Sequence, residues 1–211
     1  MKEGRDYSII YHINSHYNDL NDDLKGIDTF KQFVDNKERR RAILFDFLQI
    51  GELMNQLSKS FKGNFNNKHA DDLISMRNRV VHGYSTIKDR IIFNTLKNHL
   101  PSFINELNAF ANKRYQEHLQ KLMGKKVKVI IDERVDSISY GYTEVLTTLD
   151  GRFQEAIVLN NYGQSDLLSG YVIALIKHKK DNTIRLLISK NKKELSDTDL
   201  DNKVFDDYML K

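Results

Sequence analysis

The spacing of apolar residues changes near Gly124, and this change constrains the fold more than any other feature of the sequence. Before Gly124 apolar residues recur every three or four positions, as in helices that bury one face. In residues 37–60 the positions at this spacing are Ile43, Leu44, Phe47, Leu48, Ile50, Leu53, Met54 and Leu57. After Gly124 the spacing falls to two, which is typical of strands with one buried face. The chain therefore changes from helices to strands at this point.

Before Gly124 the sequence predicts an antiparallel bundle of four or five helices. Asp28 is a good capping residue for a short second helix, and Gly83 can end a helix because glycine readily adopts a positive φ. Pro101 is tolerated in the first turn of the last helix. The predicted helices cover residues 7–24, 28–34, 37–60, 71–81, a segment that begins at 89, and a last one that runs from 101 towards 123.

After Gly124 five segments have the composition or alternation of strands. They cover residues 127–131, 140–148, 155–160, 171–178 and 183–190. Polar turn sequences such as Asp150-Gly151 separate them, and five short strands in so short a region indicate a small β-barrel. We therefore predict an α+β protein with a helical domain at residues 1–122 and a β domain at residues 123–211. Residues 195–210 are acidic and weakly periodic, which favours a terminal helix or a frayed tail.

The composition excludes several classes of protein and site. The chain has no cysteine, so disulfides, thiolate metal sites and cysteine nucleophiles are excluded. No apolar run approaches the roughly 20 residues of a membrane-spanning helix, and the N-terminus lacks the pattern of a signal peptide. We therefore expect a cytoplasmic protein with no membrane partner. The whole net charge of +4 lies in residues 1–123, which is compatible with a polyanionic partner such as nucleic acid.

Residues 76–84, with the sequence MRNRVVHGY, contain the parts of an RNA-cleaving site. Arg77 can hold a phosphate through its fork of donors, and a histidine such as His82 can transfer protons near neutral pH. On a regular helix the two lie about 140° apart, so they converge only if the helix ends near His82. Asn78 and Tyr84 can orient them. The same residues also fit an ordinary helix end, where the helix dipole stabilises a histidine cation.

Three segments give the helical part a family resemblance. They are Ile50-Gly51-Glu52 in the long helix, residues 74–84 and residues 96–101. Over residues 1–120, and most clearly over residues 42–107, the sequence resembles the HepT-like toxins of the HEPN superfamily. These toxins are small all-α ribonucleases of bacterial toxin–antitoxin pairs.

The resemblance implies a homodimer in which two motifs face one cleft and cleave RNA without a cofactor. It implies Arg77 and His82 as catalytic residues, and we expect Asn78 to orient them. Tyr84 would accept AMP from a cognate nucleotidyltransferase antitoxin, and the added phosphates would repel the phosphates of RNA. Glu52 is a candidate partner for Arg77, although an exposed helix charge explains it equally well. We expect Arg79 to lie on another face, as a solvated charge or at the rim of the dimer.

The C-terminal part carries a second resemblance, to soluble inorganic pyrophosphatases, over residues 124–190. The matching segments are residues 124–132, 140–142, 150–155 and 170–176. The likeness implies a small β-barrel, and pyrophosphatases hold divalent cations such as Mg²⁺ with several carboxylates. Asp150 and Glu155 match the first and last acids of the family's metal-binding segment and are candidate metal ligands, but Arg152 replaces the middle acid. Two acids are too few for that reaction, which favours a binding or regulatory module.

Two further features have both a functional and a structural explanation. The basic run at residues 37–41 can line an RNA path, but it is more simply a solvated helix turn. His12 and His16 are four residues apart and can share a metal on one helix face, but no third ligand follows at a suitable spacing. Surface histidines explain them more simply.

The interpretation that covers most of these observations is a metal-independent endoribonuclease toxin that AMP transfer to Tyr84 silences. One alternative is a non-catalytic protein that binds RNA, a nucleotide or a protein partner and keeps the motif for dimer packing. Another is a Mg²⁺-dependent phosphohydrolase centred on Asp150 and Glu155.

Overall fold

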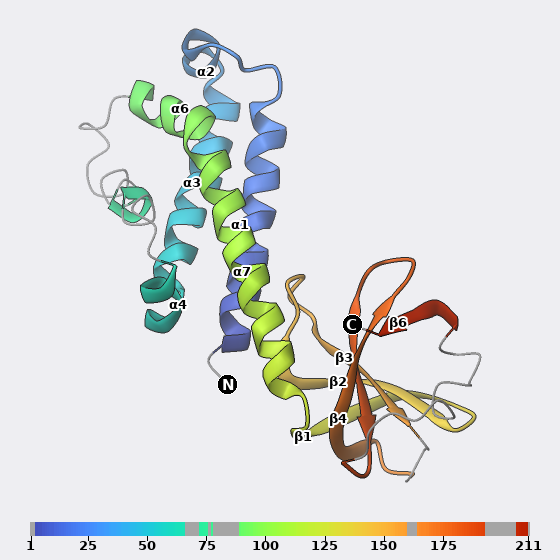
Figure 1. The fold of residues 1–211 in the computed structure, drawn as a ribbon. Helices are drawn as coiled ribbons and strands as arrows, with labels where there is room; N and C mark the ends of the chain where they lie inside the picture. Colours follow the sequence, from blue (N-terminus) through green and yellow to red (C-terminus); the bar gives the residue numbers. More distant parts are fainter. Residues whose placement is uncertain are drawn as a thin grey trace. The chain divides into compact units, whose positions relative to one another are not determined.

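The computed structural model describes residues 3–65, 72–75, 77, 89–159, 164–192 and 206–210. The chain divides into two compact units (Figure 1). The first consists of Lys2–Lys113 with Leu149–Gly151, and the second of Arg114–Thr148 and Arg152–Lys211 with Met1. Among the described residues, the first unit holds most of the helical ones, and the second holds every strand.

The described part of the first unit is a helical bundle, as predicted. The helices are α1 (Glu3–Leu24), α2 (Phe30–Asp35), α3 (Lys37–Gln56), α4 (Lys59–Asn64), α6 (Asp89–Asn98) and α7 (Leu100–Leu122). Residues 72–75 and 77 are also helical. Figure 1 shows α1 and α3 running in opposite directions, with α7 beside them. Short helices raise the number above the predicted four or five. None of the helices in the described ranges is long and apolar enough to span a membrane.

Apolar residues of the three long helices meet in one core, which is why the spacing of three and four predicts these helices well. The members that are fully buried include Ile13, Leu20, Ile43, Ile50, Met54, Leu100 and Leu107. Burying side chains of this size contributes about 1.5–3 kcal/mol each. The core side of α3 also carries an acidic residue, Asp46, and a glycine, Gly51, and both are buried.

The helix predicted over residues 37–60 is interrupted, and this prediction was wrong in its length. Leu57 has φ −55° and ψ 144°, outside the helical region, and Ser58 begins α4 by accepting a hydrogen bond from the N–H of Phe61. The carboxylate of the buried Asp6 accepts two bonds from Ser58, from its N–H at 2.8 Å and from its hydroxyl at 2.7 Å. Satisfying a buried carboxylate in this way stabilises the break. The short second helix is capped by Thr29 rather than by Asp28.

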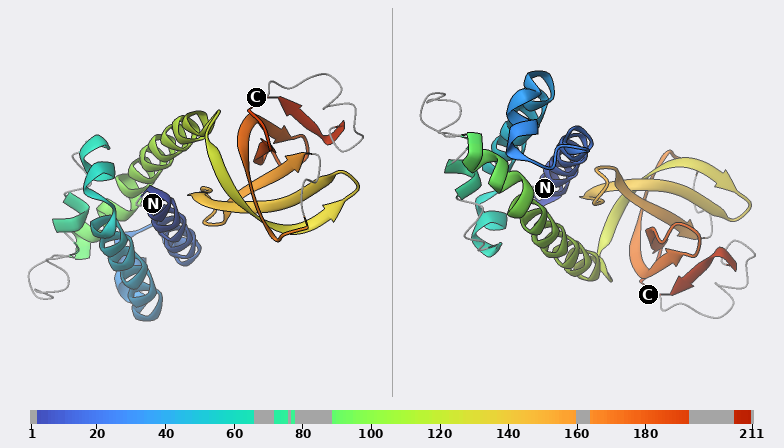
Figure 2. Two further views of the ribbon diagram at one scale, coloured as in Figure 1. Left: turned by 90° about the horizontal axis from the view of Figure 1, so that it is seen from below. Right: turned by 90° about the horizontal axis from the view of Figure 1, so that it is seen from above.

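The strands of the second unit form a closed five-stranded β-barrel, which confirms the α+β fold class. They are β1 (Lys126–Val135), β2 (Ile138–Thr147), β3 (Phe153–Leu159), β4 (Leu167–His178) and β5 (Ile184–Ser189). Their order is β1-β2-β3-β5-β4, and β4 pairs back to β1. All pairs are antiparallel except β3 with β5. The strands curl around a common interior in both views of Figure 2.

The end of the chain differs from the predicted terminal helix or frayed tail. Tyr208–Leu210 form a further strand, β6, which pairs with residues 176–178 of β4. A three-residue strand has almost no periodicity of its own, so the partner strand determines it. The rest of the predicted tail, residues 195–205, lies outside the described residues.

The helices give way to strands between Leu122 and Lys126. Gly124 has φ 68° and donates its N–H to the carbonyl of Val172 at 2.7 Å. Positive φ at this position explains why the change in spacing falls at a glycine. One division between the two compact units falls within α7, between Lys113 and Arg114. A domain boundary between residues 122 and 123 stays a prediction.

Candidate active site

Arg77 and Glu52 form an ion pair between the helical residues around position 77 and α3. The contact joins Arg77 Nη2 to Glu52 Oε2. The two side chains are 25% and 35% exposed, respectively, so water reaches the pair. Of the two explanations that the sequence leaves for Glu52, the structure supports the partner of Arg77. The pair orients one edge of the guanidinium, and a guanidinium carries five N–H donors in a fixed plane.

Gly51 allows the approach that makes this ion pair possible. A Cβ atom at Gly51 would lie 2.7 Å from Cβ and 3.0 Å from Cγ of Arg77. The nearer contact is too short for two carbon atoms, and it involves the base of the arginine side chain rather than its flexible end. Any larger residue at position 51 would therefore displace the arginine. The sequence pointed to Gly51-Glu52 only through the family resemblance.

The other predicted residues of the motif lie outside the described residues. These are Asn78, His82 and Tyr84. Asp89, which follows the stretch 78–88, begins α6 and accepts a hydrogen bond from Arg40 Nη1 of α3 at 2.8 Å. Residues on both sides of the stretch 78–88 are thus bound to α3, through Glu52 on one side and through Arg40 on the other.

The basic run at the start of α3 has structural partners at two of its arginines. Arg39 donates to the backbone carbonyls of Lys25, at 2.7 Å, and Asp22, at 3.3 Å. Arg40 bonds to Asp89. These contacts link α3 to the end of α1 and to α6, so the run contributes to the bundle and is more than a solvated helix turn.

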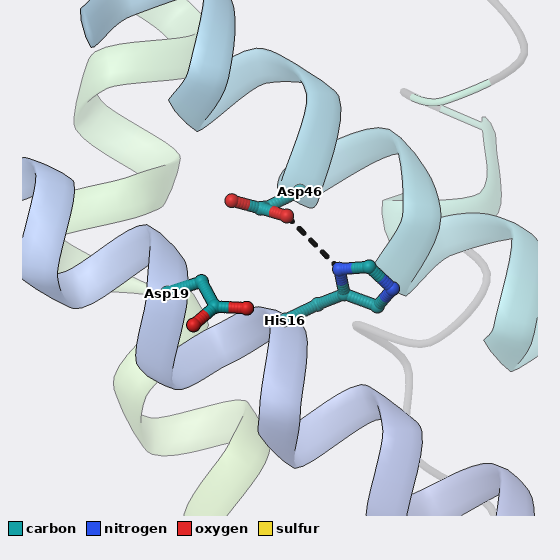
Figure 3. Close-up of side chains that lie close together, drawn as sticks. All are labelled: His16, Asp19 and Asp46. Atoms are coloured by element: carbon teal, nitrogen blue, oxygen red, sulfur yellow. Dashed lines mark hydrogen bonds and ion pairs between the residues drawn. The ribbon is translucent and has the colours of Figure 1, made fainter.

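A second group of ionisable residues lies between α1 and α3 and was missed by the sequence analysis (Figure 3). His16 Nδ1 lies 2.9 Å from Asp46 Oδ1, and Asp19 lies beside them. Burial raises the pKa of Asp46; the hydrogen bond and charge of His16 oppose the rise, and the charges of Asp19 and Asp23 add to it. A sequence signal did exist, because Asp46 lies at the core spacing of α3. His12, the predicted partner of His16, does not belong to this group.

In the barrel, the structure brings Glu155 together with two arginines. Arg185 Nε donates to Glu155 Oε2 at 2.6 Å, and Arg152 Nη1 lies 3.4 Å from Glu155 Oε1. Asp150 is exposed in the turn between β2 and β3. Within the described ranges, three potential ligands come together only at His16, Asp19 and Asp46. Mg²⁺ binding by Asp150 and Glu155 stays a prediction, and both oxygens of Glu155 contact guanidinium groups.

Comparisons with known proteins bear on the helical part of the chain. Residues 13–110 match the family model described as "Ribonuclease HepT-like". The chain is 26% identical over 100 residues to "Putative RNase MJ1380" of Methanocaldococcus jannaschii, covering 47% of this chain and 91% of that protein. It is 29% identical over 113 residues to "Putative RNase TTE0752" of Caldanaerobacter subterraneus, covering 54% of this chain and 98% of that protein. No solved structure matches the chain.

Proposed function

We propose that this protein is a metal-independent endoribonuclease, because residues 13–110 match the family model described as "Ribonuclease HepT-like". Glu52, Gly51 and Arg77 all lie inside the matched segment. The observation that carries the proposal is the ion pair between Glu52 and Arg77, since it orients an arginine next to the segment that contains His82. In the proposal the guanidinium of Arg77, oriented by Glu52, contacts a phosphate of RNA.

In the proposed reaction the 2′-oxygen of RNA attacks the neighbouring phosphorus, and the bond to the 5′-oxygen breaks. His82 accepts the proton of the 2′-hydroxyl, and a proton is delivered to the departing 5′-oxygen. The products are a 2′,3′-cyclic phosphate and a 5′-hydroxyl. Arg77 stabilises the negative charge that develops on the phosphoryl oxygens. Asn78 orients these two side chains.

We propose a homodimer as the active form, with two copies of the motif at one cleft. In such a dimer His82 of one copy can act as base while His82 of the other acts as acid. The net charge of +4 in residues 1–123 favours association with RNA.

Regulation in the proposal occurs at Tyr84. A cognate nucleotidyltransferase antitoxin in the same cytoplasm would transfer AMP to its hydroxyl, placing phosphate charges two residues from His82. Those charges would repel the RNA phosphate and silence the toxin. Incubating the protein with the nucleotidyltransferase encoded beside it and ATP should raise its intact mass in multiples of AMP. Tyr84→Phe should abolish this rise, and a rise that persists in this variant would contradict the assignment of the acceptor.

The catalytic assignment is tested with Arg77→Ala and His82→Ala. Each should reduce cleavage of a single-stranded RNA substrate by about 10²-fold or more, because each removes a group that acts in the transition state. Arg79→Ala is the matched control, with the same change two residues away and an expected rate near that of the unchanged protein. Cleavage in a chelator, with cyclic phosphate ends detected by mass spectrometry, tests the metal-independent route. Unchanged cleavage in both active-site variants would overturn the proposal.

A further inference from the structure

Strands β1 to β4 of the barrel form a Greek key. Consecutive strands β1, β2 and β3 pair as neighbours, and β4 pairs with the free edge of β1. Small five-stranded Greek-key barrels offer the face of their second and third strands to oligonucleotides and oligosaccharides. In this barrel that face carries a pocket of about 550 Å³. Residues of β1, β2, β3 and β5 line it.

A bulge in β1 shapes one side of the pocket. The register between β1 and β2 shifts between Ile131 and Glu133, so Asp132 is the extra residue. Bulges redirect side chains in this way at binding sites. Gly141 lies opposite Ile131, and a Cβ there would lie only 2.0 Å from the carbonyl oxygen of Ile130. The two strands therefore approach more closely than any other residue at position 141 allows, and Asp132 and Glu133 lie exposed at the pocket.

Two stacked aromatic rings form another part of the lining. Tyr142 of β2 and Phe153 of β3 are nearly parallel, with an angle of 8° between planes and 5.6 Å between centroids. Phe153 is 47% exposed, although a phenylalanine at that position has no polar group that benefits from water. A nucleobase stacks on exposed rings of this kind whatever its identity.

The charged residues of the pocket fall into two sets. Arg152 and Arg185 both contact the carboxylate of Glu155. The side chain of Arg152 is 62% exposed and its contact with Glu155 is long, at 3.4 Å, so a phosphate in the pocket can reach its guanidinium. Asp132 and Glu133 provide hydrogen-bond acceptors only. They repel phosphate but accept from the N–H groups on the edge of a base.

We propose that this pocket binds a nucleotide of single-stranded RNA, with the base stacked on Phe153 and the phosphate at Arg152. Guanine fits best, because its N1–H and amino group are adjacent donors that a carboxylate of Asp132 or Glu133 accepts together. The inference takes only the class of substrate, RNA, from the proposed function. It makes the barrel an RNA-binding module that holds the substrate of the HepT-like domain, and it uses neither a metal nor a pyrophosphate.

The test uses the full chain and a labelled 2′-O-methyl oligonucleotide of about 12 residues. This probe has no free 2′-hydroxyl and cannot be cleaved by the proposed reaction. Fluorescence anisotropy should give an affinity that falls roughly 5- to 100-fold in Phe153→Ala, the range expected for one lost base stack. Phe45→Ala is the matched control, since Phe45 of α3 is 57% exposed and lies outside the pocket. Affinity in Phe153→Ala equal to that in Phe45→Ala would overturn the inference.

A second variant tests the phosphate contact. Arg152→Gln should weaken binding and reduce the dependence of affinity on salt, because one counterion-releasing contact is lost. Arg134→Gln, in the same barrel but outside the pocket, should leave this salt dependence close to that of the unchanged protein. A probe rich in guanine should bind more tightly than a probe of uracil alone, and a preference for uracil would contradict the roles of Asp132 and Glu133.

Ultraviolet cross-linking of the same probe, mapped by mass spectrometry, locates the contact. Cross-links at Tyr142 or Phe153 support the inference, and cross-links confined to residues 1–113 contradict it. The two proposals fail separately. If the protein cleaves RNA but Phe153→Ala binds the probe as tightly as the unchanged protein, the proposed function stands and the inference about the barrel fails. If the protein binds the probe through Phe153 but does not cleave RNA, the inference stands and the proposed function fails.

Discussion

Both units of the molecule hold arginine with glutamate, but in different proportions. In the helical unit Glu52 forms an ion pair with one arginine, Arg77. In the barrel Glu155 contacts two arginines, Arg185 through Oε2 and Arg152 through Oε1. The pair of Glu52 and Arg77 holds one guanidinium in place. A group that acts on a reacting phosphate must be held in this way. In the trio, the guanidinium of Arg152 lies at the surface, where a phosphate can reach it.

Gly51 in the helical unit and Gly141 in the barrel each allow a very close approach, and the two approaches differ in kind. At Gly51 the neighbour is the base of the Arg77 side chain, whereas at Gly141 it is the backbone of β1. A substitution at Gly51 therefore acts on the candidate catalytic residue itself. A substitution at Gly141 acts on the pairing of β1 with β2, and hence on the barrel as a whole. We therefore expect one added methyl group to impair activity more than folding at Gly51, and to impair folding at Gly141.

Gly51→Ala should have the largest effect on activity that is specific to one unit. The added Cβ meets Arg77 at 2.7 Å, and a displacement of about 1 Å costs about 10²-fold in rate. Forcing an extra carbon into a packed site also costs about 1–3 kcal/mol of unfolding free energy. Cleavage assays and urea unfolding measure the two effects.

Gly63→Ala is the matched control for this change. Gly63 also lies in a helix, α4, but its Cβ would meet no atom within 4 Å. There the usual gain of about 0.5–1 kcal/mol for replacing a helical glycine should appear in full. If Gly51→Ala stabilised the protein as Gly63→Ala does and kept full cleavage, the contact with Arg77 would have no functional role.

Glu52→Gln should have the next largest effect on cleavage. The change keeps the shape of the side chain but removes the charge that holds Arg77, and we expect a loss of about tenfold in rate, about 1.4 kcal/mol in the transition state. Unfolding free energy should change by less than about 1 kcal/mol, because both side chains are partly exposed. The same change in the barrel, Glu155→Gln, should leave the rate at saturating RNA unaltered. Equal losses in the two variants would remove the distinction between the units.

The sequence predicted the elements of both units better than their ends, for a physical reason. Local spacing determines which face of a helix or strand is buried, and so the long helices and five strands were predictable. The break at Leu57 depends on Asp6, 52 residues from Ser58 in the chain. The strand β6 depends on β4 in the same way. Contacts between residues this far apart leave no periodic signal in the sequence.

The candidate sites differ in the same respect. The motif containing Arg77 is local, so its spacing and the family resemblance pointed to it, and Glu52 followed from the resemblance. The pocket of the barrel draws residues from four strands. Several of them lie in the segments that resemble pyrophosphatases, but that resemblance pointed to metal ligands and not to a pocket for a base. Asp46 could have been found, since a carboxylate at a core position of an amphipathic helix requires a partner.

Asp46→Asn should change how stability depends on pH. Burial raises the pKa of Asp46 above its ordinary value, against the opposing hydrogen bond and charge of His16 and with the added charges of Asp19 and Asp23. The folded state therefore keeps this proton at pH values where the unfolded state has lost it. The stability contributed by protonated Asp46 is lost as pH rises through the raised pKa. Urea unfolding between pH 4 and pH 7 should show a fall in the unchanged protein that is smaller in Asp46→Asn, and identical pH profiles would contradict the assignment.

Thr183→Val should have the smallest effect, confined to one exposed carboxyl group of the barrel. Hydrogen bonds from the hydroxyl and the N–H of Thr183 lower the pKa of Asp181 to about 2, and His178 acts in the same direction. Removing the hydroxyl should move the titration midpoint of Asp181 up towards 3.8, as measured by NMR of its carboxyl carbon. Thr183→Ser keeps the donor and should keep the midpoint near 2. In contrast to Asp46, the lowered pKa makes any stabilising contribution present above pH 3.8 and lost as pH falls through about 2. The pKa shifts of Asp46 and Asp181 have opposite signs because Asp46 is buried, whereas Asp181 is exposed and accepts hydrogen bonds. If the midpoint of Asp181 stayed near 2 in Thr183→Val, the hydroxyl of Thr183 would not be a cause of the lowered pKa.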